Sequence, residues 1–254
     1  MKRMILIIIL TSCFFIFFVY QHVSAIWKFP PLPPPEQYGN ILINRLSEKN
    51  NMKPVIFSHW SHRLHYTCTV CHLELEFNMK ANTTEITQQA NMEGRFCGTC
   101  HNGDIAFAYT KENCDKCHNG DISYGSDKFS RLRTFPETKY GNKVDWVKIM
   151  KNRLINPKNY IHVKPPPQMP FKRLLELKAE WTFVPPAIFP HDIHSELIDC
   201  SICHPDIFNI KKKGTQHFSM DSILQGKFCG VCHLTVAFPI NDCKRCHPAM
   251  GDYY

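Results

Sequence analysis

The chain has 254 residues, a length that allows one or two domains and excludes a larger array of domains. Its apolar content of 44% is ordinary, but much of it falls within the first twenty residues. Thirteen cysteines are a high count for this length, and the formal charge is +8. The cysteines are therefore the first feature to explain, and the charge by itself is no evidence for a nucleic-acid partner.

Residues 1–25 are predicted to be a secretory signal peptide. Lys2 and Arg3 precede an apolar run over residues 4–20, and small residues at 23–25 form a cleavage site. Two alternatives remain: the run is retained as a membrane anchor, since its length is close to a bilayer span, or the chain is lipidated at Cys13. We therefore predict a periplasmic or extracellular (secreted) protein, with anchoring by the N-terminus as the alternative.

Residues 26–51 are predicted to be a tether. Their first half contains FPPLPPPEQYGN, and closely spaced prolines favour a stiff, extended chain. No cysteine lies in this segment, so it is predicted to connect the leader to the rest of the chain.

Six Cys-x-x-Cys pairs, each followed at once by histidine, account for all the cysteines except Cys13. Chance would give roughly a few hundredths of one such motif per chain, so the pattern indicates six covalently attached c-type hemes. Two thiols at this spacing reach one porphyrin edge, and the adjacent histidine falls under the iron as its proximal ligand. Zinc knuckles, thioredoxin-like redox pairs and structural disulfides are the alternatives, but none requires a histidine at this position six times. The predicted heme-binding cysteines are Cys68, Cys71, Cys97, Cys100, Cys114, Cys117, Cys200, Cys203, Cys229, Cys232, Cys243 and Cys246, and the proximal ligands are His72, His101, His118, His204, His233 and His247.

The charge balance changes once hemes are included. Loss of the leader lowers the formal charge from +8 to +6, and twelve ionised propionates on six hemes bring it to about −6, with the irons uncounted. The lysines are therefore predicted to neutralise propionates and to form docking rims. We predict no nucleic-acid partner.

The six motifs form two groups of three, and in each group the first two motifs begin 29 residues apart. Such a repeat indicates an internal duplication. We predict two triheme modules, at residues 52–122 (module 1) and 185–254 (module 2), separated by a linker over 123–184. Apolar residues near helical spacing predict short helices at 144–155 and 170–181 in this linker.

The predicted fold class is a multiheme cytochrome c with tandem triheme modules. About seventy residues cannot build an ordinary core around three hemes, so the porphyrins are predicted to form the core. Short α-helices and loops would wrap the hemes, with little regular secondary structure. Aromatic residues such as Phe57, Trp60 and Phe189 are predicted to pack on heme faces.

Two further histidines precede the first motif of each module. His59 and His62 stand as far ahead of Cys68 as His191 and His194 stand ahead of Cys200. The spacing i, i+3 places each pair on neighbouring but offset directions of a helix, so that one pair can serve two hemes. The four histidines are therefore predicted to be second axial ligands, giving six-coordinate, low-spin irons.

The stretches PVIFSHWSHRLHYTCTVCH, GRFCGTCHNGDIAF and GKFCGVCHLTVAF resemble the triheme cytochrome c7-type domain, a relative of tetraheme cytochrome c3. The resemblance covers both modules and leaves out the linker. It implies that the first histidine of each Phe-x-His-x-x-His element ligates the heme directly following, and the second ligates the next heme. The implied ligand pairs are His59 with His72, His62 with His101, His191 with His204 and His194 with His233.

The third heme of each module departs from this pattern. In cytochrome c7 a histidine shortly before the second attachment motif ligates the third heme, and module 1 has none there. In module 2, His217 precedes Cys229 by twelve residues, and it is predicted to ligate the heme at His247, with Met220 as the alternative. The alternatives for the heme at His118 are an open position or one of His65, His162 and Met92.

Together these features predict an exported hexaheme c-type cytochrome that carries electrons between redox partner proteins and is not an enzyme. One alternative is a multiheme reductase of a small oxidant, such as nitrite or hydroxylamine, at a five-coordinate heme. The mature chain has seven histidines outside the motifs, and six would saturate every heme, so the sequence does not require an open site. The other alternative is a heme subunit of a membrane-anchored or filamentous electron-transfer complex. The sequence specifies neither the partners nor the oligomeric state.

Overall fold

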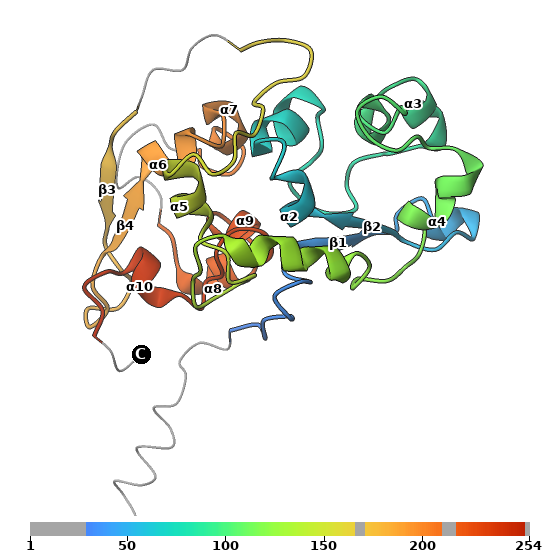
Figure 1. Cartoon of the computed structure of the whole chain (residues 1–254). Helices are drawn as coiled ribbons and strands as arrows, with labels where there is room; N and C mark the ends of the chain where they lie inside the picture. The colour runs from blue at the N-terminus through green and yellow to red at the C-terminus, as the bar shows by residue number, and fades with distance from the viewer. Residues whose placement is uncertain (1–28, 166–170, 210–216, 252–254) are drawn as a thin grey trace, which may run out of the picture. The chain divides into compact units, whose positions relative to one another are not determined.

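The computed structural model describes residues 29–165, 171–209 and 217–251, so the predicted signal peptide lies outside the described residues (Figure 1). The elements are short, which confirms the predicted fold class of short helices and loops with little regular secondary structure. No helix in the described ranges is long and apolar enough to cross a membrane. The elements are β1 (Asn40–Ile43), η1 (Glu48–Asn50), β2 (Val55–Ser58), α2 (His59–His62), η2 (Val70–Glu74), α3 (Gln88–Met92), η3 (Phe96–Thr99), η4 (Lys111–Asn113), α4 (Cys114–Cys117), η5 (Ser126–Thr134), α5 (Trp146–Lys151), β3 (Leu174–Leu177), β4 (Ala187–Pro190), α6 (His191–Ser195), α7 (Cys200–Cys203), α8 (Met220–Leu224), α9 (Gly230–His233) and α10 (Cys243–Cys246).

An antiparallel strand pair leads into the histidine-bearing helix at the start of each module, and the first strand of each pair comes from the segment before the module (Figure 1). In the first pair, β1 lies against β2 with Asn40 opposite Ser58, and in the second β3 lies against β4 with Leu174 opposite Pro190. The second strand of each pair runs directly into α2 or α6. The strand pair therefore fixes where the helix starts, and with it the position of the two histidines on that helix.

The prediction of a helix over 170–181 is wrong at 174–177, which form β3. Leu, Glu and Lys favour helices, but side chains along β3 alternate between exposed and half-buried positions, the period of a strand. Hydrogen bonding to β4 therefore makes residues 174–177 a strand, although their side chains favour a helix. The predicted helix over 144–155 is confirmed as α5, although the helix is shorter and ends at Lys151.

The segment predicted as a tether packs against the rest of the chain from Tyr38 onward. Tyr38 is only 2% exposed, and its hydroxyl donates to the carbonyl oxygen of Ala237 at 2.6 Å. Strand β1 also lies in this segment. Residues 38–43 of the predicted tether therefore make structural contacts of their own, because prolines stiffen only their own stretch and carry no information about how later residues pack.

Equivalent glycines pack two neighbouring turns together in each module. A side-chain Cβ at Gly98 would overlap the backbone carbonyl of Asn91, and one at Gly230 would overlap that of Ile223. Only glycine permits this contact between the second attachment loop and the helix before it, α3 or α8. The duplication seen in the sequence is therefore also a duplication of local packing.

A small hydrophobic cluster holds the linker against module 1. Its buried members are Trp60, Leu132, Val144 and Ile149, and the Trp60 indole donates to the carbonyl oxygen of Glu36 at 3.0 Å. The prediction that Trp60 packs on a heme face is therefore wrong, since its ring belongs to this cluster and contacts Phe129 edge to face at 5.3 Å. A conventional core thus exists beside the hemes, built mainly by the linker.

We expect Ile149→Ala to destabilise the protein by about 3 kcal/mol, because Ile149 is fully buried and its truncation leaves a cavity. Denaturant unfolding, followed by tryptophan fluorescence, measures this change. The control is Ile105→Ala, the same truncation at a side chain that is 52% exposed. Equal losses for both variants would contradict the assignment of Ile149 to a core.

Glu74 fastens the distal part of the linker to module 1. Its carboxylate accepts hydrogen bonds from three consecutive backbone N–H groups, those of Ile161 (2.7 Å), His162 (2.6 Å) and Val163 (3.1 Å). Desolvation raises the pKa of Glu74, but these three donors outweigh it and hold the pKa below its usual value. The ionised carboxylate therefore contributes stability at neutral pH.

We expect Glu74→Gln to cost about 1 kcal/mol at pH 7, because charge-assisted hydrogen bonds are replaced by weaker ones and solvent screens the largely exposed carboxylate. The folded-state pKa lies below the unfolded value, so this contribution is complete above the unfolded pKa and is lost as the pH falls through the folded pKa. Denaturant midpoints measured from pH 7 to pH 3 should therefore converge for the two proteins. Glu76→Gln, at an exposed glutamate nearby, is the control for the loss of one negative charge.

Candidate functional site

Five of the six attachment motifs fold as short helical turns, and the first motif runs into the π-helix η2 (Val70–Glu74). Three of them coincide with α4, α7 and α10, and the turn places both thiols of a motif on one side. In five motifs the backbone N–H of the histidine donates to the carbonyl oxygen of the first cysteine, closing the turn. These donors are His101 (2.9 Å), His118 (2.8 Å), His204 (2.9 Å), His233 (3.0 Å) and His247 (2.8 Å). All twelve motif thiols are free of disulfides, which leaves them available for thioether bonds.

Each motif histidine is oriented through its Nδ1 atom. A carbonyl oxygen can only accept, so Nδ1 carries the proton and Nε2 keeps its lone pair for a metal. This contact is the usual one behind a metal-ligating histidine. The acceptors are the carbonyl oxygens of Phe77 for His72 (2.8 Å), Phe107 for His101 (3.1 Å), Lys53 for His118 (3.0 Å), Phe208 for His204 (2.7 Å), Phe238 for His233 (2.8 Å) and Pro185 for His247 (2.6 Å).

The four histidines predicted as second axial ligands are oriented in the same way. In each of them Nδ1 donates to a backbone carbonyl oxygen. The acceptor is Gly39 for His59 (2.8 Å), Ser58 for His62 (2.8 Å), Arg173 for His191 (3.0 Å) and Pro190 for His194 (2.8 Å). The acceptors of His59 and His191 directly precede β1 and β3, so the strand pairs also serve to orient these rings. Sequence reasoning missed these carbonyl acceptors, for which the only signal was the matching position of the two histidine pairs.

The remaining three histidines differ from these ten. Within the described ranges, no hydrogen bond reaches a ring nitrogen of His65, His162 or His217, and all three side chains are exposed. Met92, a further alternative ligand, is 56% exposed. The four predicted axial histidines are therefore each held by a carbonyl contact. The alternatives for the third heme of each module have no such contact in the described ranges.

Two pairs of imidazoles face one another at a matching distance. The ring centroids of His62 and His101 are 6.3 Å apart, and those of His194 and His233 are also 6.3 Å apart. Two imidazoles that bind one metal ion from opposite sides through Nε2, at about 2 Å each, have centroids about 6 Å apart. Both pairs are combinations that the resemblance implied, and each leaves room for one iron.

A phenylalanine supports the two histidines of each helix. Phe57 stacks on His62 with ring centroids 4.4 Å apart and meets His59 edge to face at 4.8 Å. Phe189 makes the same two contacts with His194 and His191, at the same two distances. The prediction that these phenylalanines pack on heme faces has to be extended, because they also fix the planes of the imidazoles.

Burial lowers the pKa of several of these histidines, both in the facing pairs and at His59. Desolvation lowers the pKa of His59 to about 4, with smaller contributions from the charges of His72, His62 and Arg63 and an opposing one from the Gly39 carbonyl. Desolvation likewise lowers the pKa of His233 to about 4. A histidine must be neutral to bind a metal, so these rings are in the ligating form at neutral pH.

The attachment loops form a series of neighbours. Burial is the first cause of the raised pKa of each motif thiol discussed here, and the charge of a nearby thiol in another loop raises it further. Such pairs occur inside each module and also between modules. The neighbouring thiols in different loops are Cys97 and Cys117, Cys71 with Cys97 and Cys100, Cys203 with Cys68, Cys232 with Cys68 and Cys203, Cys229 with Cys203, and Cys246 with Cys229.

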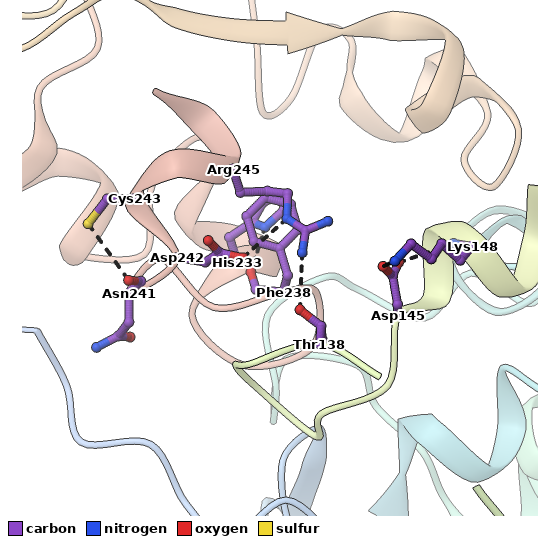
Figure 2. Close-up of polar contacts among 9 residues, drawn as sticks. All are labelled: Thr138, Asp145, Lys148, His233, Phe238, Asn241, Asp242, Cys243 and Arg245. Atoms are coloured by element: carbon purple, nitrogen blue, oxygen red, sulfur yellow. Dashed lines mark hydrogen bonds and ion pairs between the residues drawn. The ribbon is translucent and has the colours of Figure 1, made fainter. Parts of the chain in front are cut away.

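The last attachment loop is also tied to the linker. Figure 2 shows Arg245, which lies between Cys243 and Cys246, bonded to Thr138 and Asp242. Its guanidinium donates to the hydroxyl of Thr138 at 3.1 Å, and to the carboxylate of Asp242 at 3.1 Å. The guanidinium carbon also lies 5.3 Å from the ring centroid of Phe238. One arginine therefore joins the sixth loop, the linker and the segment that orients His233.

These features together fit heme c at each motif: paired thiols on one side of a turn, and a histidine whose Nε2 is free. The chain is a multiheme c-type cytochrome with six covalently attached hemes c. The family model for cytochrome c7 and related cytochrome c matches residues 55–119 and 187–248, half of the chain. The chain therefore belongs to the cytochrome c7 family, as tandem triheme modules.

Several solved structures are similar to the chain. The C-terminal hexaheme fragment of GSU1996 has 26% sequence identity, with 87% of this chain and 99% of that fragment covered and a TM-score of 0.28. A c7-type three-heme cytochrome domain has 32% identity, with 34% of this chain and 94% of that domain covered and a TM-score of 0.28. The N-terminal hexaheme fragment of GSU1996 has 21% identity, with coverages of 84% and 99% and a TM-score of 0.27. The comparison with curated proteins found no match.

Proposed function

We propose that the chain is an exported electron carrier that passes electrons between redox partner proteins through six closely spaced hemes, most of them ligated by two histidines. The observation that carries the proposal is the duplicated pair of facing imidazoles, each 6.3 Å apart with a free Nε2. When bound, heme supplies a reversible one-electron couple at iron. Two imidazoles at one iron leave no position for a substrate, which suits transfer of electrons without bond making.

The residues of this chain have three tasks in that function. The motif thiols hold each porphyrin covalently, and the carbonyl-oriented histidines present Nε2 to the irons. The proposed second ligands are His59 for the heme at His72, His62 for that at His101, His191 for that at His204, His194 for that at His233 and His217 for that at His247. The loops and the linker exclude water from some of these rings, such as those of His59 and His233.

The proposed partners are redox proteins that dock transiently, because electron-transfer encounters use small interfaces steered by charge. The lysines around the propionates would supply that steering. We propose a periplasmic or secreted location, which rests on the leader sequence and on the need to attach heme outside the cytoplasm. Membrane attachment through the N-terminus, within a larger electron-transfer complex, is the variant of this proposal.

A second candidate function is reduction of a small oxidant at a five-coordinate heme. The observation that favours it is the lack of any carbonyl-oriented ring among His65, His162 and His217 in the described ranges. The heme at His118 is the proposed place for such an open iron, since module 1 offers no histidine in the family position.

The test is a heme count combined with a spin-state spectrum of the mature protein at low temperature. Six hemes that are all low-spin support the carrier and exclude the reductase. Five low-spin hemes and one high-spin heme that binds carbon monoxide favour the reductase. A sample with no Soret absorption would contradict both.

A further inference from the structure

The first attachment loops of the two modules are hydrogen-bonded to each other. Thr69 lies between Cys68 and Cys71, in the first loop of module 1. Its hydroxyl oxygen accepts from the backbone N–H of Asp199 at 3.0 Å and donates to the carbonyl oxygen of Leu197 at 3.4 Å. Asp199 directly precedes the first loop of module 2, so one side chain links loops that are far apart in sequence.

Packing around Thr69 is consistent with a built contact. Val70, next to Thr69, is 1% exposed, and Ile202, inside the first loop of module 2, is 7% exposed. Elements η2 and α7 contact each other directly. Leu197 also lines a small pocket together with Cys68 and Arg63. Apolar residues of both modules are therefore buried where Thr69 makes its hydrogen bonds.

We propose that Thr69 is a positioning residue that holds the first heme of module 1 beside the first heme of module 2, so that the crossing between modules lies there. This inference rests on the proposed electron-carrier function. An exchange at that point transfers one electron and no atoms: the iron on one side is oxidised and the iron on the other side is reduced.

This crossing differs from the order of the motifs along the chain. A path in sequence order would join the third loop of module 1, at Cys117, to the first loop of module 2, at Cys200. The hydrogen bonds of Thr69 and the contact between η2 and α7 instead join the first loop of module 1 to the first loop of module 2.

The test compares three variants of the mature, full-length holoprotein. Thr69→Val removes the hydroxyl at nearly constant shape, and Thr69→Ser keeps it. Thr99→Val is the matched control, because Thr99 is also inside an attachment loop and is 7% exposed, but its hydroxyl donates to Gly94 within module 1 at 2.9 Å. The readouts are the Soret circular-dichroism couplet from neighbouring porphyrins and the rate of internal electron equilibration after partial photoreduction.

Thr69→Val is expected to lose part of the Soret couplet and to slow internal equilibration severalfold, with the heme count and the spin states of the wild type retained. Thr69→Ser should match wild type, and Thr99→Val should equilibrate between modules at the wild-type rate. An unchanged couplet and rate in Thr69→Val would overturn the inference. If that variant carries fewer than six hemes, Thr69→Ala removes the same hydroxyl and is judged by the same two readouts. A failure of the proposed function would appear differently, as a wild-type protein without six hemes or without internal equilibration.

Discussion

Replacing His62 by alanine is expected to convert one heme in six from low-spin to high-spin iron without loss of heme. The His62 ring lies 6.3 Å from that of His101, with Nε2 free and Nδ1 bonded to the Ser58 carbonyl. Removing it opens one axial position at the heme that Cys97 and Cys100 hold. Because the thioether bonds are untouched, the heme count should stay at six.

Low-temperature electron paramagnetic resonance and carbon monoxide titration measure this result. His65→Ala is the control, since His65 is a near neighbour in the chain but is exposed and has no carbonyl contact at its ring in the described ranges. That variant should remain fully low-spin at the heme of His101. The same experiment at His194, the equivalent residue of module 2, should again give one high-spin heme. A low-spin spectrum for His62→Ala would contradict its assignment as a ligand.

The double substitution Cys97→Ala with Cys100→Ala is expected to lower the heme count from six to five and to destabilise module 1 strongly. This second loop packs against α3 through Gly98, and its two thiols are the only covalent hold on that heme. Without the porphyrin, the residues around it would border a cavity far larger than one left by a single side chain. Mass spectrometry of the intact protein gives the count, and thermal unfolding gives the stability.

Cys13→Ala is the matched control for this experiment. Cys13 is the single cysteine outside the motifs and belongs to the predicted leader, so its replacement should leave six hemes and an unchanged unfolding temperature. Retention of six hemes by the double variant would contradict thioether attachment at Cys97 and Cys100.

Much of the site could be predicted from sequence because covalent heme attachment imposes a fixed local spacing. The cysteines and proximal histidines are read directly from the motifs, and the repeated position of His59 and His191 indicated a second set of candidate ligands. The carbonyl partners could not be predicted in this way. Gly39 and Arg173, which orient those two histidines, lie in segments assigned to the tether and the linker.

The strand pairs were missed for a related reason. Strand β3 is four residues long, and LLEL satisfies a helical pattern as well as an alternating one. What decides between them is the partner strand β4, which ends where His191 begins. Trp60 shows the same limit on local reasoning: His59 and His62 beside it in sequence are predicted heme ligands, but its packing partners, such as Ile149, come from the linker.

The histidine that ends each module is bonded to the residue that opens it. His118 Nδ1 donates to the carbonyl of Lys53, and His247 Nδ1 donates to that of Pro185. Each module is thus a closed ring of chain whose two ends meet. A unit with adjoining ends can be copied head to tail, or cut and rejoined at another loop, without rerouting the backbone inside it. Longer arrays and circular permutants built from this unit should therefore assemble, since lengthening the series requires only another linker.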